Sequence, residues 1–311
     1  MRLVISLGGN ALLRKGQAIT AENQRENAAL AAMWLAPVLR EHEVVIAHGS
    51  GPQLAMLALQ SFSYRVAEPT RLDLLCAQAG GETGYLLARE LRNVLGAGRH
   101  VVAQVAQVLV NPDDEAFGKP TKPIGPFYER TYAHQLRQLR SWQFADFDGE
   151  YRRIVPVPRL LETIDIGAAE LMLGSGRAVV MCGPVPVAAG SGGELLGTEA
   201  LPDKDEFASL LAQELDADGL LFLTDVLSVA TDFGKPEQRQ IRQATPASLR
   251  TLAFDPSSMG PKVKAACDFV EASHKWAAIG SISNVEHVLS GETGTRVVTT
   301  MAGGAVDFWP R

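Results

Sequence analysis

The sequence predicts an α/β protein: a three-layer α/β/α sandwich built around a mainly parallel sheet. Two observations predict this class. Apolar runs of Val, Ile and Leu alternate along the chain with longer segments of helical periodicity, which is the order of repeated βαβ units. Most of these apolar runs are also continuous, as in parallel strands that helices cover on both faces. The 311 residues are enough for one large domain or two smaller ones.

The elements follow one another in a regular order. The expected strands cover residues 3–7, 43–47, 100–110, 153–157, 178–182, 220–226, 277–282 and 295–300. The expected helices cover residues 20–40, 52–64, 71–96, 164–175, 204–216 and 260–274. Thr20, followed by Glu22 and Asn23, gives the first long helix a capped start, because a threonine oxygen can accept from a free backbone N–H there.

Residues 111–130 break this alternation. They contain the prolines of Asn111-Pro112-Asp113-Asp114 and of Lys119-Pro120-Thr121-Lys122-Pro123-Ile124-Gly125-Pro126. Four prolines exclude a regular helix. With the aromatic and polar stretch that follows, they predict a small protruding flap subdomain, residues 111–152, over an active cleft. A plain surface loop is the alternative.

Composition restricts the classes of function. Apolar residues make up 46% of the chain and charged residues 21%, with a net charge of −6, so we expect a soluble globular protein that binds no nucleic acid. No apolar stretch has the length of a membrane span, and we expect no signal segment before the strand at residue 3. Cys76, Cys182 and Cys267 are unpaired in spacing, which indicates buried thiols in the cytoplasm and no metal site.

Glycine-rich turns follow two of the predicted strands. The strand 3–7 leads into Gly8-Gly9-Asn10, and the strand 43–47 leads through His48 into Gly49-Ser50-Gly51. Backbone N–H groups gathered at strand ends, where helices begin, form anion sites. We therefore expect one shared cradle for a phosphate or carboxylate, with two ordinary turns as the alternative.

Three lysines stand in unusual positions. Lys122 lies in the flap, Lys204 lies between Asp203 and Asp205, and Lys262 follows Gly260-Pro261 where a helix is expected to begin. A lysine near a helix N-terminus opposes the helix dipole, a cost that a bound multiply charged anion offsets. Each could instead be a lysine facing solvent. Together with the glycine turns they favour phosphoryl transfer, in which lysines neutralise charge, Asp205 orients them, and Mg²⁺ bridges the nucleotide phosphates.

Other catalytic motifs are absent from the sequence. It contains no Gly-x-x-x-x-Gly-Lys-Ser/Thr loop, no Gly-x-Ser-x-Gly elbow and no His-Glu-x-x-His helix. A P-loop nucleotidase and the common hydrolase classes are therefore disfavoured.

Taken together, these motifs resemble the carbamate kinases of the amino-acid kinase superfamily. The likeness is collinear along essentially the whole chain, and the Pro-Thr-Lys-Pro-Ile-Gly run of the flap is its most discriminating part. The runs that carry it are Leu7-Gly8-Gly9-Asn10-Ala11-Leu12-Leu13, His48-Gly49-Ser50-Gly51-Pro52-Gln53, Gly84-Tyr85-Leu86-Leu87, Pro120–Tyr128, Tyr151–Val155, Asp203-Lys204-Asp205, Leu223-Thr224-Asp225-Val226, Ser258-Met259-Gly260-Pro261-Lys262-Val263 and Gly291-Glu292-Thr293-Gly294-Thr295.

The resemblance implies a fold, a reaction and a set of site residues. It implies a single amino-acid kinase domain, residues 1–311, with an acid-substrate lobe at 1–185 and a nucleotide lobe at 186–311. It implies reversible phosphoryl transfer between ATP plus carbamate and ADP plus carbamoyl phosphate, with Mg²⁺, in a homodimer, commonly in arginine breakdown. The implied catalytic residues are Lys122, Lys204, Asp205 and Lys262. The implied substrate-binding residues are Gly8, Gly9, Asn10, Gly49, Ser50 and Gly51. The implied nucleotide-binding residues are Thr224, Asp225, Phe233, Gly234, Met259 and Gly260.

The sequence also departs from the family pattern. The family usually has four glycines after the central strand, where this chain reads Met181-Cys182-Gly183-Pro184, and Ser50 replaces an asparagine. Proline lacks an N–H, so Pro184 removes one possible phosphate contact. These departures leave two alternatives open: the same fold with a different small-acid acceptor, or a non-catalytic family member that binds a ligand.

Overall fold

The computed structural model describes residues 1–311 except 15, 50, 65–68, 99, 302–305 and 311. Its centre is a twelve-stranded sheet in the order β11-β12-β14-β13-β10-β1-β2-β8-β3-β7, with β15 beside β12 and β9 beside β8. The strands are β1 (Arg2–Leu7), β2 (Glu43–His48), β3 (Val101–Val110), β7 (Leu160–Thr163), β8 (Ala178–Ala189), β9 (Leu195–Gly197), β10 (Gly219–Thr224), β11 (Ala230–Thr231), β12 (Arg239–Ala244), β13 (Trp276–Ser281), β14 (Thr295–Val297) and β15 (Val306–Phe308).

The middle of this sheet is parallel. β13, β10, β1, β2, β8 and β3 all run in the same direction, whereas β14 pairs antiparallel with β13 and β7 pairs antiparallel with β3. In the register of β1, Leu7 lies opposite both His48 of β2 and Leu223 of β10. Three loops therefore leave the sheet side by side at the carboxyl ends of these strands, where parallel α/β sheets place their ligands.

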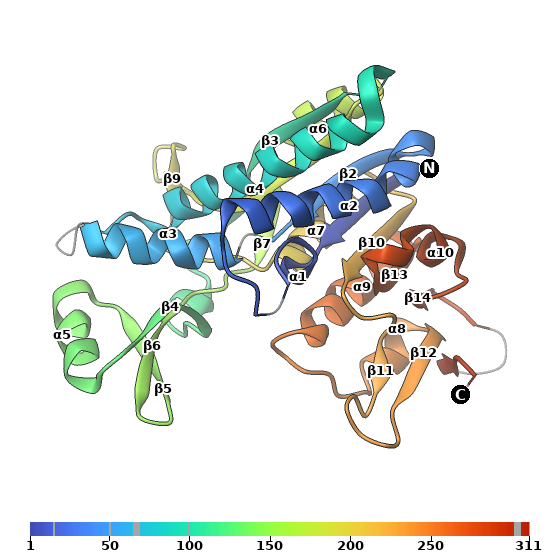
Figure 1. Ribbon diagram of the computed structural model, residues 1–311. Coiled ribbons are helices and arrows are strands. Elements are labelled where there is room, and N and C mark those ends of the chain that lie inside the picture. Colours follow the sequence, from blue (N-terminus) through green and yellow to red (C-terminus); the bar gives the residue numbers. More distant parts are fainter. Residues whose placement is uncertain (15, 50, 65–68, 99, 302–305, 311) are drawn as a thin grey trace.

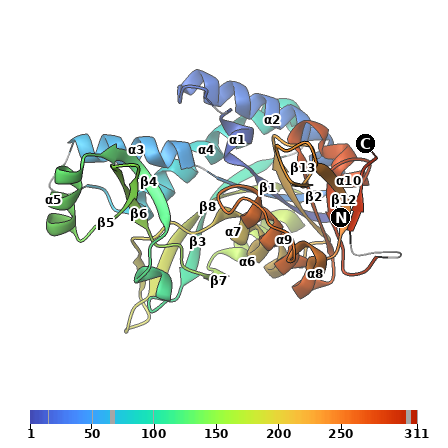
Figure 2. The same cartoon turned by 90° about the horizontal axis from the view of Figure 1, so that it is seen from below.

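Helices cover both faces of the sheet (Figures 1 and 2). On one face α2 (Ala21–Glu41), α4 (Leu72–Leu95) and α10 (Val285–Ser290) pack on Leu221 and Leu223. On the other face α6 (Ile166–Gly174), α7 (Lys204–Glu214) and α9 (Met259–Ser273) pack on Leu220 and Phe222. Further helices beside this sheet are α1 (Gly9–Leu12), α3 (Gly51–Tyr64) and α8 (Pro246–Leu249), with 3₁₀ turns at Gly96–Gly98, Glu115–Phe117 and Ile282–Asn284. The three-layer fold class is confirmed.

Residues 122–155 form a separate small unit. The strands β4 (Lys122–Tyr128), β6 (Glu150–Val155) and β5 (Gln143–Phe147) make an antiparallel sheet in that order, which α5 (Arg130–Arg140) covers. Tyr128, Phe144 and Tyr151 form its core with Leu136. Figure 1 shows this flap projecting below α3. A protruding subdomain is confirmed, whereas its place over an active cleft stays a prediction. The expected core strand at 153–157 is wrong, because residues 153–155 complete a hairpin of this subdomain and Pro156 follows.

The cap at Thr20 and the division into two lobes are also expected from the sequence. Thr20 caps α2, since its side-chain oxygen accepts from the Asn23 N–H at 3.2 Å. The division into lobes at residue 185 stays a prediction, and that residue falls inside β8. Among the described residues, the helices are too short or too polar to cross a membrane.

Candidate active site

The start of α7 brings a lysine and an aspartate to the carboxyl ends of the central strands. Asp203 is the N-cap, and its Oδ1 accepts from the backbone N–H groups of Asp205 at 2.8 Å and Glu206 at 3.1 Å. This cap satisfies two of the N–H groups that a helix start leaves unpaired. It therefore fixes Lys204 and Asp205 as the first two helical residues.

Asp205 joins the two lysines that the sequence singled out. Its Oδ1 accepts a hydrogen bond from Lys204 Nζ, and its Oδ2 lies 3.1 Å from Lys262 Nζ. Lys262 reaches it from the first turn of α9, 57 residues further along the chain. The two helices pack side by side on one face of the sheet. The structure thus brings together three of the four predicted catalytic residues.

A fourth member of this cluster was missed at the sequence level. Ser6 of β1 donates from Oγ to Asp205 Oδ1 at 3.0 Å and accepts from Lys204 Nζ at 3.4 Å. The signal that could have found it is the polar residue in an otherwise apolar run, on the same face of the strand as Val4, which packs with the α7 core.

Charge and burial oppose each other in the cluster. Burial alone would raise the pKa of Asp205, but Lys204 and Lys262 outweigh it, so its pKa is lowered and the carboxylate is ionised. Burial lowers the pKa of Lys204, helped by Lys262 and resisted by Asp205. With one negative charge between two positive ones, the cluster carries a net positive charge that suits an anionic ligand.

The glycine turns flank this cluster, but two of their N–H groups are not free. Gly8 N–H donates to Leu223 O at 2.9 Å, and Gly49 N–H donates to Leu7 O at 3.3 Å. The sheet ladder continues through these two N–H groups, and the substrate-binding role of Gly8 and Gly49 stays a prediction. The N–H groups that open each helix, at Gly9 and Gly51, remain the candidates.

Space around the turns agrees with that assignment. A Cβ added at Gly9 or Gly51 would meet nothing within 4 Å, whereas one at Gly49 would press on the Lys204 side chain. Ser50 lies outside the described residues, and the side chain of Asn10 is not described.

The flap lysine lies near the start of α7. Lys122 Nζ donates to the carbonyl of Pro202 at 3.4 Å, two residues before Lys204. Ile124 anchors this strand by packing with Leu54 and Leu72 of α3 and α4. The structure therefore places all four predicted catalytic side chains around the same turn.

The predicted nucleotide residues occupy two places. Thr224 ends β10 beside the first glycine turn and Asp225 follows it, and Thr224 Oγ1 donates to Asp225 Oδ1 at 3.0 Å. Met259 and Gly260 open α9, one turn from Lys262, and Gly260 N–H donates to Asp255 O at 2.8 Å.

Phe233 and Gly234 are set apart from these residues. They lie in the exposed turn between β11 and β12, where Gly234 N–H donates to Gln238 Oε1 at 2.8 Å. The side chain of Phe233 is 71% exposed. Their part in nucleotide binding stays a prediction.

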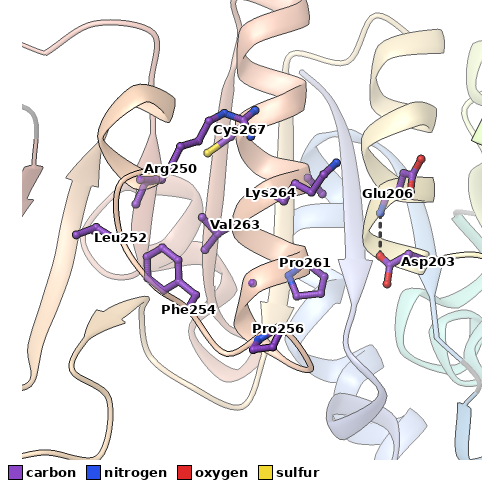
Figure 3. A pocket seen from close by; sticks show the side chains of 13 residues that line it. Asp203, Glu206, Arg250, Leu252, Phe254, Pro256, Pro261, Val263, Lys264 and Cys267 are labelled. Atoms are coloured by element: carbon purple, nitrogen blue, oxygen red, sulfur yellow. Dashed lines mark hydrogen bonds between the residues drawn. The ribbon is translucent and has the colours of Figure 1, made fainter. Parts of the chain in front are cut away.

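A groove lies beside α9, lined in part by Gly260. Figure 3 shows side chains that line it, with Asp203 and Glu206 at the start of α7 on one side of α9 and Phe254 on the other. The groove has a volume of about 600 Å³. Lys264 of α9 lines this groove and donates to Asp268, whereas Lys262 turns to Asp205. Lys264 is therefore a natural comparison for Lys262.

The unusual Met181–Pro184 stretch is part of β8. Val105 of β3 pairs with Cys182 and Gln107 pairs with Val185, so Gly183 and Pro184 face the single residue Ala106. Such a bulge leaves a residue unpaired, and a proline fits there without breaking the ladder. The α4 glycines press on this bulge: a Cβ at Gly80 would lie 3.2 Å from the Cys182 carbonyl carbon.

Comparison with known proteins agrees with the fold. The model of the amino acid kinase family matches residues 1–280, which defines the class of protein. The carbamate kinase of Haemophilus influenzae is 40% identical over 305 residues, 97% of this chain and 98% of that protein. The carbamate kinase of Escherichia coli K12 is 42% identical over 294 residues, 94% and 98% of the two chains.

A solved structure gives the same result. The carbamate kinase of Giardia lamblia bound to AMP-PNP superposes with a TM-score of 0.90 at 32% identity, covering 96% of this chain and 98% of that one. The chain belongs to the carbamate kinase family.

Proposed function

We infer that the chain is a carbamate kinase, which transfers a phosphoryl group reversibly between ATP plus carbamate and ADP plus carbamoyl phosphate. The observation that carries the inference is the cluster of Lys204, Asp205 and Lys262 at the carboxyl ends of the central strands. It stands in a chain that is about 40% identical to carbamate kinases over nearly its whole length.

The cluster suits the charge changes of phosphoryl transfer. The loose transition state spreads negative charge over the oxygens of the migrating group, so positioning and charge stabilisation supply most of the catalysis. Lys204 and Lys262 supply two ammonium groups, and Asp205 holds both. We propose that Lys122 of the flap contacts the carbamoyl phosphate from the other side of the same turn.

The turns and the end of β10 complete the proposed site. The N–H groups of Gly9 and Gly51 would bind the small acid or its phosphate, with Asn10 and Ser50 beside them. Thr224 and Asp225, the 233–234 turn, and Met259 and Gly260 would hold the nucleotide. In this arrangement the lysine cluster lies between the acid and the nucleotide.

We propose that Mg²⁺ enters with the nucleotide. Among the described residues, no three His, Cys, Asp or Glu side chains are grouped as a metal site, and both oxygens of Asp205 already accept from lysines. Mg²⁺ is commonly held by substrate phosphates with few protein ligands, and this set of residues fits that arrangement. When bound, the ion would neutralise phosphate charge.

Neither alternative function has an observation in its favour. The Met181–Pro184 stretch motivated both a different acid acceptor and a non-catalytic role, but it forms a bulge that the β3 and α4 backbones accommodate. Lys204, Asp205 and Lys262, the charged groups proposed to act on the phosphoryl group, are present and in contact.

The test is ATP formation from ADP, Mg²⁺ and carbamoyl phosphate, corrected for spontaneous decomposition of the carbamoyl phosphate. We expect robust turnover that Lys262→Ala lowers by about two orders of magnitude or more, while Lys264→Ala leaves it unchanged. A folded protein that binds nucleotide but makes no ATP would contradict the proposed function. Equal turnover in the two lysine variants would contradict the proposed mechanism.

Three further proposals extend the family resemblance. We propose a homodimer, which light scattering would test by a mass twice that of the chain. We place the enzyme in the cytoplasm, in keeping with three free and buried cysteines, and fractionation of cells would test this location. We propose that its carbamoyl phosphate comes from arginine breakdown, which the ATP yield from arginine with and without the enzyme would test.

A further inference from the structure

Ser6 is a polar residue where the fold calls for an apolar one. It lies in β1 between Ile5 and Leu7, in the middle of the sheet, and is 1% exposed. A buried hydroxyl costs free energy unless it is hydrogen-bonded. The contacts of this hydroxyl must therefore account for a serine in the core.

The hydroxyl is used fully, as both donor and acceptor. Its O–H donates to Asp205 Oδ1 at 3.0 Å, and its oxygen accepts from Lys204 Nζ at 3.4 Å. Both partners lie 198 and 199 residues away in sequence. The contact thus connects the central strand to the two adjacent charges of α7.

The number of donors on an ammonium group makes this contact important. Lys204 has three N–H donors, of which one goes to Asp205 Oδ1 and one to Ser6 Oγ. Two fixed bonds stop the ammonium from rotating about the Cε–Nζ bond, so the direction of its third N–H is also fixed.

We infer that Ser6 is a positioning residue for phosphoryl transfer, which orients the Lys204 ammonium so that its third N–H faces the migrating phosphoryl group. This inference rests on the proposed catalytic role of Lys204. Ser6 itself does not touch the substrate, because it is buried beneath Lys204 and Asp205.

The same contact also affects the charge on Lys204. The groups that face this ammonium are Asp205 and Asp203 on α7, Lys262 on α9 and His48 at the end of β2. Burial and Lys262 already lower its pKa. A hydroxyl oxygen that accepts from the ammonium favours the charged form, so removal of Ser6 Oγ lowers this pKa further.

The experiment uses the whole protein in the ATP-forming assay. For Ser6→Ala we expect kcat to fall roughly tenfold, the effect of one hydrogen bond to a charged group. The KM for ADP should stay within about twofold, because ground-state binding is unchanged. The alkaline limb of the kcat–pH profile should move to lower pH.

Two comparisons separate positioning from packing. Ser6→Thr and Ser6→Val have the same shape and differ only in the hydroxyl, so the threonine variant should retain more kcat and the original alkaline limb. Ser209→Ala removes another buried serine of the α7 region, which accepts from Gln213 Nε2 at 3.1 Å. It should change neither quantity.

The inference is overturned if Ser6→Ala keeps the kcat and pH profile of the unmodified protein, if Ser6→Thr and Ser6→Val behave alike, or if Ser209→Ala reproduces the loss. Lys204→Ala in the same assay separates a failure of the proposed role of Ser6 from a failure of the proposed role of Lys204. If Lys204→Ala loses turnover while Ser6→Ala does not, only the role of Ser6 fails. If Lys204→Ala retains turnover, the proposed catalytic role of the lysine fails with it.

Discussion

Gly49 lies directly beneath the side chain of Lys204. A Cβ at residue 49 would come within 2.7 Å of Lys204 Cδ and 3.2 Å of Cε. Glycine is therefore needed at the end of β2, because any larger residue would displace the Lys204 side chain that crosses it. The second glycine turn and the charged cluster form one unit through this contact.

Gly49→Ala should lower activity with little effect on folding. The added methyl group meets the far end of a flexible side chain, which can shift at small cost in the free energy of unfolding, about 1 kcal/mol or less. The shift moves Nζ of a lysine that must be well placed, and a misplacement of about 1 Å can cost about a hundredfold in rate. We expect kcat to fall between about tenfold and a hundredfold in the ATP-forming assay.

Gly167→Ala is the control for this substitution. A Cβ at Gly167 of α6 would meet nothing within 4 Å, so both activity and unfolding should stay unchanged. A large drop in the free energy of unfolding of Gly49→Ala, with normal kcat in the folded fraction, would contradict the relationship between Gly49 and Lys204.

Lys122→Ala should weaken the binding of carbamoyl phosphate more than the binding of ADP. Its ammonium lies near Pro202, at the turn before Lys204, where the proposed site places the small phosphate. Loss of one charged contact should raise the KM for carbamoyl phosphate about tenfold to a hundredfold, as initial rates at fixed ADP would measure.

Lys119 offers a matched comparison in the same segment. It is exposed and pairs with Glu115 at 3.0 Å, so Lys119→Ala should leave both KM values unchanged. An equal rise in the two variants would mean that flap charge in general, and not Lys122 itself, attracts the substrate.

The sequence could predict the parts of the site that depend on local patterns. Lys204 and Lys262 stand at helix starts, and Asp203 caps the helix that begins at Lys204. The strand ends at Leu7 and His48 follow from continuous apolar runs. These features need only neighbouring residues, so composition and spacing are enough to find them.

Contacts between distant segments could not be predicted in the same way. The meeting of Ser6 with Asp205 depends on which face of β1 lies under α7. The use of the Gly8 and Gly49 N–H groups depends on how far the sheet ladder continues past each strand. The expected strand ends at residue 182, yet β8 continues to Ala189 through a bulge that only its pairing with β3 reveals.

Gly84→Ala should destabilise the fold strongly. A Cβ at Gly84 would lie 2.0 Å from Cys182 Sγ, in the closely packed contact between α4 and β8. Overpacking of this kind typically costs up to about 3 kcal/mol in the free energy of unfolding, which urea denaturation would measure.

A substitution at Cys182 tests the same contact from the other side. Cys182→Ala removes the sulfur, and the Cβ of residue 182 lies 3.4 Å from the added methyl group, an ordinary contact. The double variant Gly84→Ala/Cys182→Ala should therefore be more stable than the sum of the single effects by about 1–3 kcal/mol. Simple additivity would mean that the sulfur and the methyl group do not compete for the same space.

His48 should make the fold sensitive to mild acid. It is fully buried at the end of β2, and burial lowers its pKa from 6.5 to about 4; the Gly49 backbone opposes this shift and Lys204 adds to it. As the pH falls from about 6.5 to 4, the unfolded chain takes up a proton that the folded protein does not. The free energy of unfolding therefore falls across this range, by about 3 kcal/mol for a shift of this size.

Urea denaturation of the unmodified protein and of His48→Gln at several pH values between 7.5 and 4.5 would measure this contribution. The difference between the two free energies of unfolding isolates His48, because carboxylates such as Asp205 titrate in both proteins. We expect the difference to shift against the unmodified protein as the pH falls, whereas His100→Gln, at an exposed histidine, should show no such trend. Parallel curves for the unmodified protein and His48→Gln would mean that His48 binds a proton equally well in the folded and unfolded states.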